Sequence, residues 1–250
     1  MITKVAIAGY RSLRKIVLPL GRLTVVTGGN GTGKSSIYRS LRLLADIADD
    51  RAIRSLAMEG GFESIRWAGP EKISRAMRAG EVPIQGTLRQ GPVALQLGFQ
   101  DDDLSYGIEL GLPTNGASLF SGDPEIKREL IWLGDKPTPS NIIVDRRGPG
   151  IRARNADHDM IQLETGLAPY DSMIRHLSGP DAPWELSHLR NRLSAWRFHD
   201  QIRTDQEAPA RRPQIGTRTV SLSPGGEDVA AAVQTILEIG DADALAAAID

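Results

Sequence analysis

A glycine-rich segment, residues 28–35 with the sequence GGNGTGKS, carries the clearest chemistry in this chain. It matches the phosphate-binding pattern G-x-x-x-x-G-K-S/T at every fixed position. Glycines let successive backbone N–H groups turn inward around phosphate oxygens, and a helix that begins directly after them points its positive end at the same anion. Lys34 would supply a cation to the β and γ phosphates, and the Ser35 hydroxyl would bind Mg²⁺.

We therefore predict that the segment binds Mg²⁺ and ATP, with Lys34 as its catalytic cation and Ser35 as a metal ligand. The predicted nucleotide-binding residues are Gly28, Gly29, Asn30, Gly31, Thr32, Gly33, Lys34, Ser35 and Ser36.

The elements on both sides of this segment fit such a loop. Short apolar runs predict strands over residues 5–8, 13–18 and 23–27, and the last of these runs ends in the glycine cluster. After the cluster, apolar residues recur at spacings of four, three and four, which predicts a helix; they are Ile37, Leu41, Leu44 and Ala48. The expected order is strand, loop, helix.

Alternating apolar residues further along the chain indicate an antiparallel meander with one buried face. Its three strands are predicted over 82–84, 93–99 and 104–110. Residues 124–132 follow Asp123 and open with a proline, which predicts a short helix. The remaining expected elements are edge strands at 142–144 and 160–163 and helices at 186–196 and 229–237. We predict an α/β fold of the P-loop NTPase class, with a β-rich nucleotide-binding lobe over 1–165 and a helical region over 166–250.

Composition narrows the chemistry. The 250 residues include no cysteine, which excludes disulfides and cysteine-bound metals but leaves oxygen ligands available. The four histidines share no spacing typical of metal ligands. No apolar run reaches the length of a membrane span and the first residues lack a signal-peptide core, so we expect a cytoplasmic protein with no membrane partner. Residues 1–89 carry 15 basic and 7 acidic side chains, which is a weak indication of a polyanionic partner, because a solvated surface of mixed charge explains them better.

The stretch AGYRSLRKIVLPLGRLTVVTGGNGTGKSS resembles the opening of ABC/SMC-like ATPases, in particular the RecF- and OLD-related branch of AAA-family ATPases. In that branch a strand pair with F-R-S or F-K-S precedes a strand that ends in G-x-N-G-x-G-K-S. Weaker similarity continues at residues 60–69, 193–200 and 223–241. The resemblance implies an ATPase head of ABC/SMC type in which a homodimer sandwiches ATP. It also implies a role in DNA repair, with DNA as a partner. A nuclease or an antitoxin-type protein is the alternative partner that it implies.

The chain departs from this family in one respect: no four apolar residues followed by Asp-Glu, the Walker B pattern, occur in the sequence. The run IIVD at 142–145 is followed by Arg146, not an acid. The run LSPGGE at 222–227 mimics a signature motif, but Pro224 interrupts it, and we interpret Ser223 and Pro224 as a helix N-cap. We expect an incomplete head whose signature and Walker B elements lie beyond residue 250, and which hydrolyses ATP only when these and a dimer partner complete it.

The resemblance implies two further roles, for which the chain offers three residues. Arg11, in YRSL, stands where the family places a basic residue near the nucleotide; the alternative is a solvent-facing arginine. Gln100 resembles the glutamine that senses Mg²⁺ and the attacking water, and Gln201 competes for that role; the alternative for each is an exposed polar residue.

Two other functions remain open from the residues. One is an ATP-dependent module that associates with DNA or regulates a partner, with little hydrolysis of its own. The other is a P-loop kinase, which the meander and Asn30 make weaker.

Overall fold

The computed structural model describes residues 1–70, 74–83, 94–114, 119–179 and 182–249. They form two compact units, residues 1–195 and residues 196–250. The fold is mixed α/β, as the sequence predicted. The lobe boundary expected at residue 165 stays a prediction.

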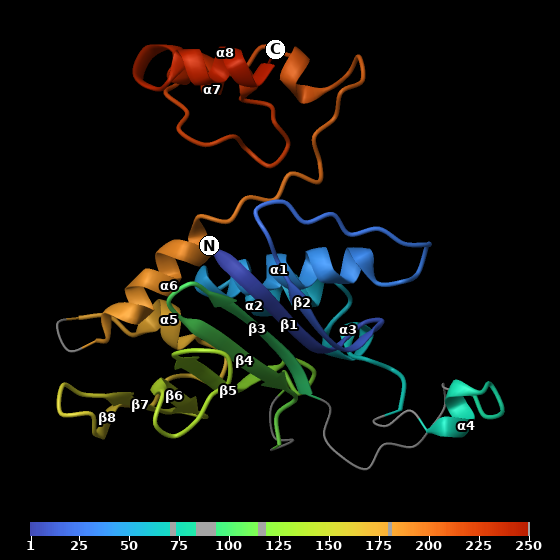
Figure 1. Cartoon of the computed structure of the whole chain (residues 1–250), viewed down its shortest axis with the longest axis vertical. Coiled ribbons are helices and arrows are strands. Elements are labelled where there is room, and N and C mark those ends of the chain that lie inside the picture. The colour runs from blue at the N-terminus through green and yellow to red at the C-terminus, as the bar shows by residue number, and fades with distance from the viewer. Residues whose placement is uncertain (71–73, 84–93, 115–118, 180–181, 250) are drawn as a thin grey trace. The chain divides into compact units, whose positions relative to one another are not determined.

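The first unit is built on one eight-stranded antiparallel sheet with the strand order β2-β1-β3-β4-β5-β6-β7-β8 (Figure 1). The strands are β1 (Ile2–Tyr10), β2 (Leu13–Pro19), β3 (Ala94–Asp101), β4 (Ser105–Gly111), β5 (Glu125–Trp132), β6 (Ile142–Arg147), β7 (Gly150–Arg154) and β8 (Met160–Thr165). Consecutive strands pair with each other except that β3 pairs with β1, which places β1 inside the sheet and β2 at its edge.

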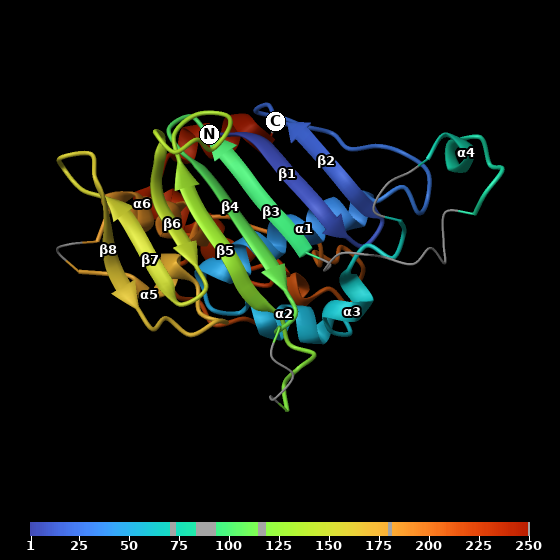
Figure 2. The same cartoon turned by 90° about the horizontal axis from the view of Figure 1, so that it is seen from below.

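Helices cover one face of this sheet (Figure 2). Side chains alternate along a strand, so in β1 Val5 and Ile7 are buried under the helices while Ala6 between them is exposed. The helices of the first unit are α1 (Lys34–Ala48), α2 (Ala52–Met58), α3 (Phe62–Ile65), α4 (Arg75–Arg78), α5 (Met173–His176) and α6 (Trp184–Ser194). The core lies between the sheet and α1, α2, α5 and α6.

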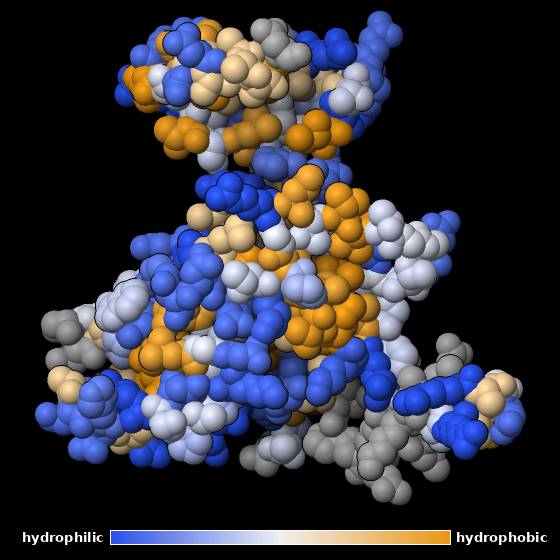
Figure 3. Space-filling model, viewed as in Figure 1, coloured by the Kyte–Doolittle hydropathy of each residue, from blue (hydrophilic) through white to orange (hydrophobic). Residues whose placement is uncertain are grey.

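The strand predicted over residues 23–27 does not form. Leu23, Val25 and Val26 lie in a coil between β2 and α1, with 85%, 74% and 45% of their surfaces exposed. A strand needs a neighbour to satisfy its backbone, and β2 pairs only with β1. Residues 23–27 therefore have no partner strand with which to form backbone hydrogen bonds. Figure 3 shows apolar surface over this part of the first unit.

The helix predicted over residues 124–132 was also wrong, because this segment is strand β5. Ile126, Leu130 and Ile131 fit a helical spacing as well as a strand, and pairing with β4 on one side and β6 on the other decides for the strand. Two strands of the predicted meander are confirmed as β3 and β4. Of the third predicted strand, 82–84, residues 82 and 83 lie in no strand and residue 84 is outside the described residues, as is residue 93, the first position predicted for β3.

A buried ion pair joins β5 and β6 to the segment that follows β8. Glu129 and Arg146 have fully buried side chains and contact each other at 3.3 Å. Glu129 also accepts hydrogen bonds from the Tyr106 hydroxyl (2.7 Å), the Ser172 hydroxyl (2.5 Å) and the backbone N–H of Met173 (2.9 Å). Burial, followed by the charge of Glu129, raises the pKa of Tyr106 well above its ordinary value. Every oxygen of this buried carboxylate is thus satisfied by a donor.

The second unit contains η1 (Pro209–Arg211), α7 (Val229–Ile239) and α8 (Ala242–Ile249). The predicted N-cap at Ser223 is corrected: α7 begins five residues later, after Asp228, whose carboxylate accepts hydrogen bonds from the backbone N–H and hydroxyl of Ser223. Among the described residues of both units, no helix is long and apolar enough to cross a membrane.

Candidate functional site

The glycine-rich loop runs directly into α1, as the sequence predicted. Gly33 is the N-cap of α1 and has φ +103°, while Gly28 and Gly31 have φ +150° and +80°. L side chains disfavour these conformations, so the glycines are required by the shape of the loop. The positive end of a 15-residue helix therefore points at the loop.

Lys34 bends back over the loop that precedes it. Its Nζ donates hydrogen bonds to the carbonyl oxygens of Gly28 and Gly29, both at 2.7 Å. The Thr32 hydroxyl donates to the same Gly29 oxygen at 2.9 Å. The loop is thus closed around its own ammonium group, and Asn30 and Ser35 lie exposed beside it.

The turn between β1 and β2 anchors the start of α1. A Cβ at Gly33 would lie 2.8 Å from the Cδ2 atom of Leu13 and 3.1 Å from the Oγ atom of Ser12. Ser36 is buried and its hydroxyl lies 3.3 Å from that of Ser12. Sequence reasoning did not assign a role to Ser12 or Leu13, although the YRSL motif contains both.

Arg11 lies in the same turn, but its side chain is bound to an acid. Its Nε and Nη2 donate to the same Oε2 atom of Glu59, at 3.0 and 2.5 Å, and the Tyr10 hydroxyl donates to it at 2.9 Å. Burial lowers the pKa of Arg11, but the hydrogen bond to Glu59 outweighs it and holds that pKa above its ordinary value. Arg11 is therefore next to the loop in the chain and paired away from it, so its role near a nucleotide stays a prediction.

Of the two candidate glutamines, Gln100 is not brought to the loop. Gln100, in β3, is the register partner of Lys4, six residues before Tyr10 along β1. At a rise of about 3.3 Å per residue, it lies about 20 Å from the β1 end that carries the loop anchor. Gln201 is exposed in the second unit. The Mg²⁺ role of either residue stays untested.

The acidic residue of the run IIVD is also remote. Asp145 lies in β6, four strands away from β1, and accepts hydrogen bonds from Arg128 and Arg147. Strands are about 4.8 Å apart, so this separation is about 19 Å. The geometry agrees with the sequence argument against Asp145 as a Walker B acid.

With the loop in place, comparison with known proteins decides the family. A family described as "AAA domain, putative AbiEii toxin, Type IV TA system" matches residues 23–230, which is most of the chain. The chain belongs to this AAA domain family. The AAA domain carries the P-loop of a nucleotide-binding ATPase, and the match begins just before that loop.

One curated relative adds a second point of comparison. UvrABC system protein A of Thermus thermophilus is 24% identical over 160 residues, which cover 56% of this chain and 16% of that protein. The matched part of the chain therefore spans only a small part of this relative's length. No solved structure matches the chain.

Proposed function

We propose that this AAA domain is an ATP-binding head of ABC/SMC type, related to the RecF and OLD branch. The single observation that carries the proposal is the loop 28–35, with its complete motif, its glycines in left-handed conformations and the ammonium of Lys34 at its mouth. The family match and the similarity to UvrABC system protein A support it.

The loop residues fit a nucleoside triphosphate. A Cβ at Gly31 would meet no atom within 4 Å, so the backbone there is open to a large anion. The Lys34 ammonium already donates hydrogen bonds to two carbonyl oxygens at 2.7 Å, and phosphate oxygens are stronger acceptors than carbonyls. Ser35, exposed in the first turn of α1, offers a hydroxyl to Mg²⁺. When bound, Mg²⁺ would supply positive charge against the phosphates.

Hydrolysis needs a group that positions water for in-line attack, and the loop 28–35 itself contains no acid. Glu59 contacts the turn that anchors the loop, but Arg11 and Tyr10 already use its carboxylate. We infer that turnover depends on a dimer partner and on segments that supply a signature and a Walker B acid.

ATP-dependent dimerisation tests the head assignment. Sedimentation velocity of the wild-type protein with Mg²⁺ and ATP should show a shift from monomer to dimer that Lys34→Ala abolishes. Lys15→Ala, which removes an exposed lysine of β2, is the matched control and should dimerise normally. A wild-type protein that binds ATP but stays monomeric at all concentrations would contradict the two-subunit sandwich.

The second candidate is a DNA-associated or partner-regulating module, with an antitoxin-type protein or a nuclease as a further possible partner. The excess of basic residues over 1–89 favours it. Filter binding of duplex DNA, with and without ATP over a salt series, separates the two functions. Phosphate contacts would make the affinity fall steeply with salt, whereas a head that acts only on nucleotide would retain no DNA on the filter.

A further inference from the structure

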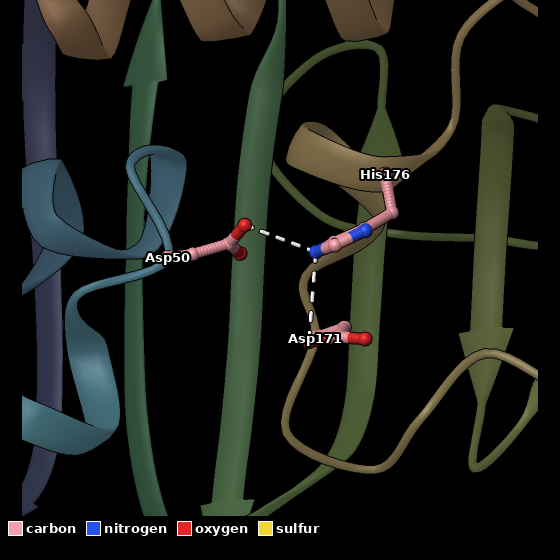
Figure 4. Close-up of side chains that lie close together, drawn as sticks. All are labelled: Asp50, Asp171 and His176. Carbon is pink, nitrogen blue, oxygen red and sulfur yellow. Dashed lines mark ion pairs between the residues drawn. The ribbon is translucent and has the colours of Figure 1, made fainter.

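Two aspartates and one histidine converge at the end of α1 opposite to the nucleotide loop (Figure 4). Asp50 follows α1, Asp171 follows β8, and His176 is the last residue of α5. The Nε2 atom of His176 lies 3.0 Å from Oδ2 of Asp50 and 3.5 Å from Oδ1 of Asp171. One ligand atom from each residue lies within 4.8 Å of the others.

These spacings match a first-row metal ion. An imidazole nitrogen and carboxylate oxygens bind Zn²⁺ with bonds of about 2.1 Å, which places tetrahedral ligand atoms about 3.4 Å apart. The two separations, 3.0 and 3.5 Å, lie on either side of that value. Asp171 and His176 also border a hollow of about 300 Å³, which leaves room for a water molecule as a fourth ligand.

The buried ion pair of the sheet fixes two of the three ligands. Arg146 donates to the backbone carbonyl oxygens of Asp171 and of Ala168, the latter at 2.9 Å. Glu129 holds Ser172 and the first N–H of α5, the helix that ends in His176. The cluster is thus tied to the rigid sheet through its backbone, as a preorganised site requires.

The same atoms permit a simpler reading, an ion pair of a charged histidine with two aspartates. Arg175 supports that reading, because its Nε lies 3.7 Å from the same Oδ2 atom of Asp50. The two interpretations differ in the effect of added metal. Residues that form only an ion pair do not bind the metal, whereas a set of metal ligands does.

We propose that Asp50, Asp171 and His176 form a binding site for a divalent transition-metal ion of the Zn²⁺ class. The site is separate from the Mg²⁺ site at Ser35, because α1 has 15 residues and spans about 22 Å between them. Such an ion would join the end of α1 to α5. This inference does not depend on ATP binding.

Cobalt titration tests the site. Co²⁺ bound by a tetrahedral set of nitrogen and oxygen ligands absorbs visible light much more strongly than the hydrated ion does. When the untagged protein is titrated with CoCl₂, this absorption should rise until one equivalent of Co²⁺ is bound. Added ZnCl₂ should then remove the absorption by displacing Co²⁺. His176→Ala and Asp171→Asn should each weaken binding at least about tenfold.

Three control variants make the result specific. His158→Ala removes an exposed histidine from the turn between β7 and β8 and should bind Co²⁺ normally. Arg175→Gln removes the competing cation and should bind at least as tightly as the wild type, whereas Lys34→Ala should leave binding unchanged. Only the spectrum of hydrated Co²⁺, or binding that survives His176→Ala, would overturn the proposal and leave the ion pair as the role of these residues.

Discussion

Lys34 and Gly28 stand six residues apart at the two ends of one loop, and the Nζ atom of the first donates a hydrogen bond to the carbonyl oxygen of the second at 2.7 Å. This hydrogen bond and the one of equal length to the carbonyl oxygen of Gly29 hold the ammonium at the mouth of the loop. A phosphate group would replace two neutral acceptors by charged ones, which adds the attraction between opposite charges to each hydrogen bond. The relationship explains how the loop keeps its shape and how it can exchange its own oxygens for those of ATP.

The left-handed glycine at the start of α1 should be the least replaceable in the loop. Gly33→Ala puts a Cβ 2.8 Å from Leu13 at φ +103°, so we expect a loss of stability of about 2–3 kcal/mol and loss of ATP binding. Gly31→Ala has φ +80° but open space, so it should cost only about 1 kcal/mol. Urea unfolding of the two variants measures the difference. Equal costs would mean that the contact with Leu13 does not constrain the loop.

The buried pair in the sheet should dominate stability. Glu129→Ala leaves the Arg146 charge buried without its partner and removes the acceptor of three further donors, so we expect a loss of about 3–5 kcal/mol. The partly exposed pair of Arg128 and Asp145 joins the same two strands, and Arg128→Ala should cost about 1 kcal/mol or less. Urea unfolding compares the two variants. Similar losses in the free energy of unfolding would show that burial does not make the Glu129–Arg146 pair more important for stability than the exposed pair.

The contact between Arg11 and Glu59 allows a direct test of the arginine's predicted role. If Arg11 also reaches the nucleotide, Arg11→Gln weakens both stability and ATP affinity, whereas Glu59→Gln weakens stability alone. From the geometry we expect both variants to lose about 1–3 kcal/mol of stability and to keep their ATP affinity. Calorimetric titration with ATP, on variants shown to be folded, distinguishes these outcomes.

Asp101 should make stability depend on pH in acid. Burial raises the pKa of this carboxyl, but hydrogen bonds from the N–H groups of Leu104 and Asp103 and the Arg192 guanidinium outweigh it and hold the pKa below its ordinary value of 3.8. A lowered pKa in the folded state gives stability that is present above the unfolded value and is lost as the pH falls through the folded value.

Asp101→Asn should therefore destabilise the protein at neutral pH, and the difference from wild type should shrink below about pH 4. Urea unfolding at several pH values measures it. Because Nε2 of His188 lies 3.8 Å from the same carboxylate, the series is repeated in His188→Gln. A difference that stays constant down to about pH 2 would show that the ionised carboxylate is not what stabilises this hairpin.

The sequence predicted those parts of the fold in which local pattern and local structure agree. The loop motif and the apolar spacing from Ile37 to Ala48 identify α1, and clear alternation identifies β3 and β4. Residues 124–132 were misassigned because their apolar spacing suits either element, and only pairing with two distant strands decides for β5. Residues 23–27 show the reverse case, a good strand pattern with no strand beside it.

The candidate sites differ in the same way. The nucleotide loop is contiguous, so eight residues in a row reveal it. Ser12 and Glu59 reach its anchor only through folding, and Asp50, Asp171 and His176 come from three segments separated by up to 126 positions. Spacing in the sequence carries no signal for such a cluster. Asp101 stands in a run of three aspartates, a pattern typical of a solvated turn, yet it is buried and paired with Arg192 of α6.

ATP affinity measured by titration calorimetry in the presence of Mg²⁺ tests the central claim most directly. The wild-type protein should bind ATP, and Lys34→Ala should lose detectable binding because the phosphates lose their cation. Lys15→Ala should bind as the wild type does. If Lys34→Ala, shown to be folded, binds ATP with unchanged affinity, then loop 28–35 is not the nucleotide site and the assignment of this AAA domain as an ATP-binding head is wrong.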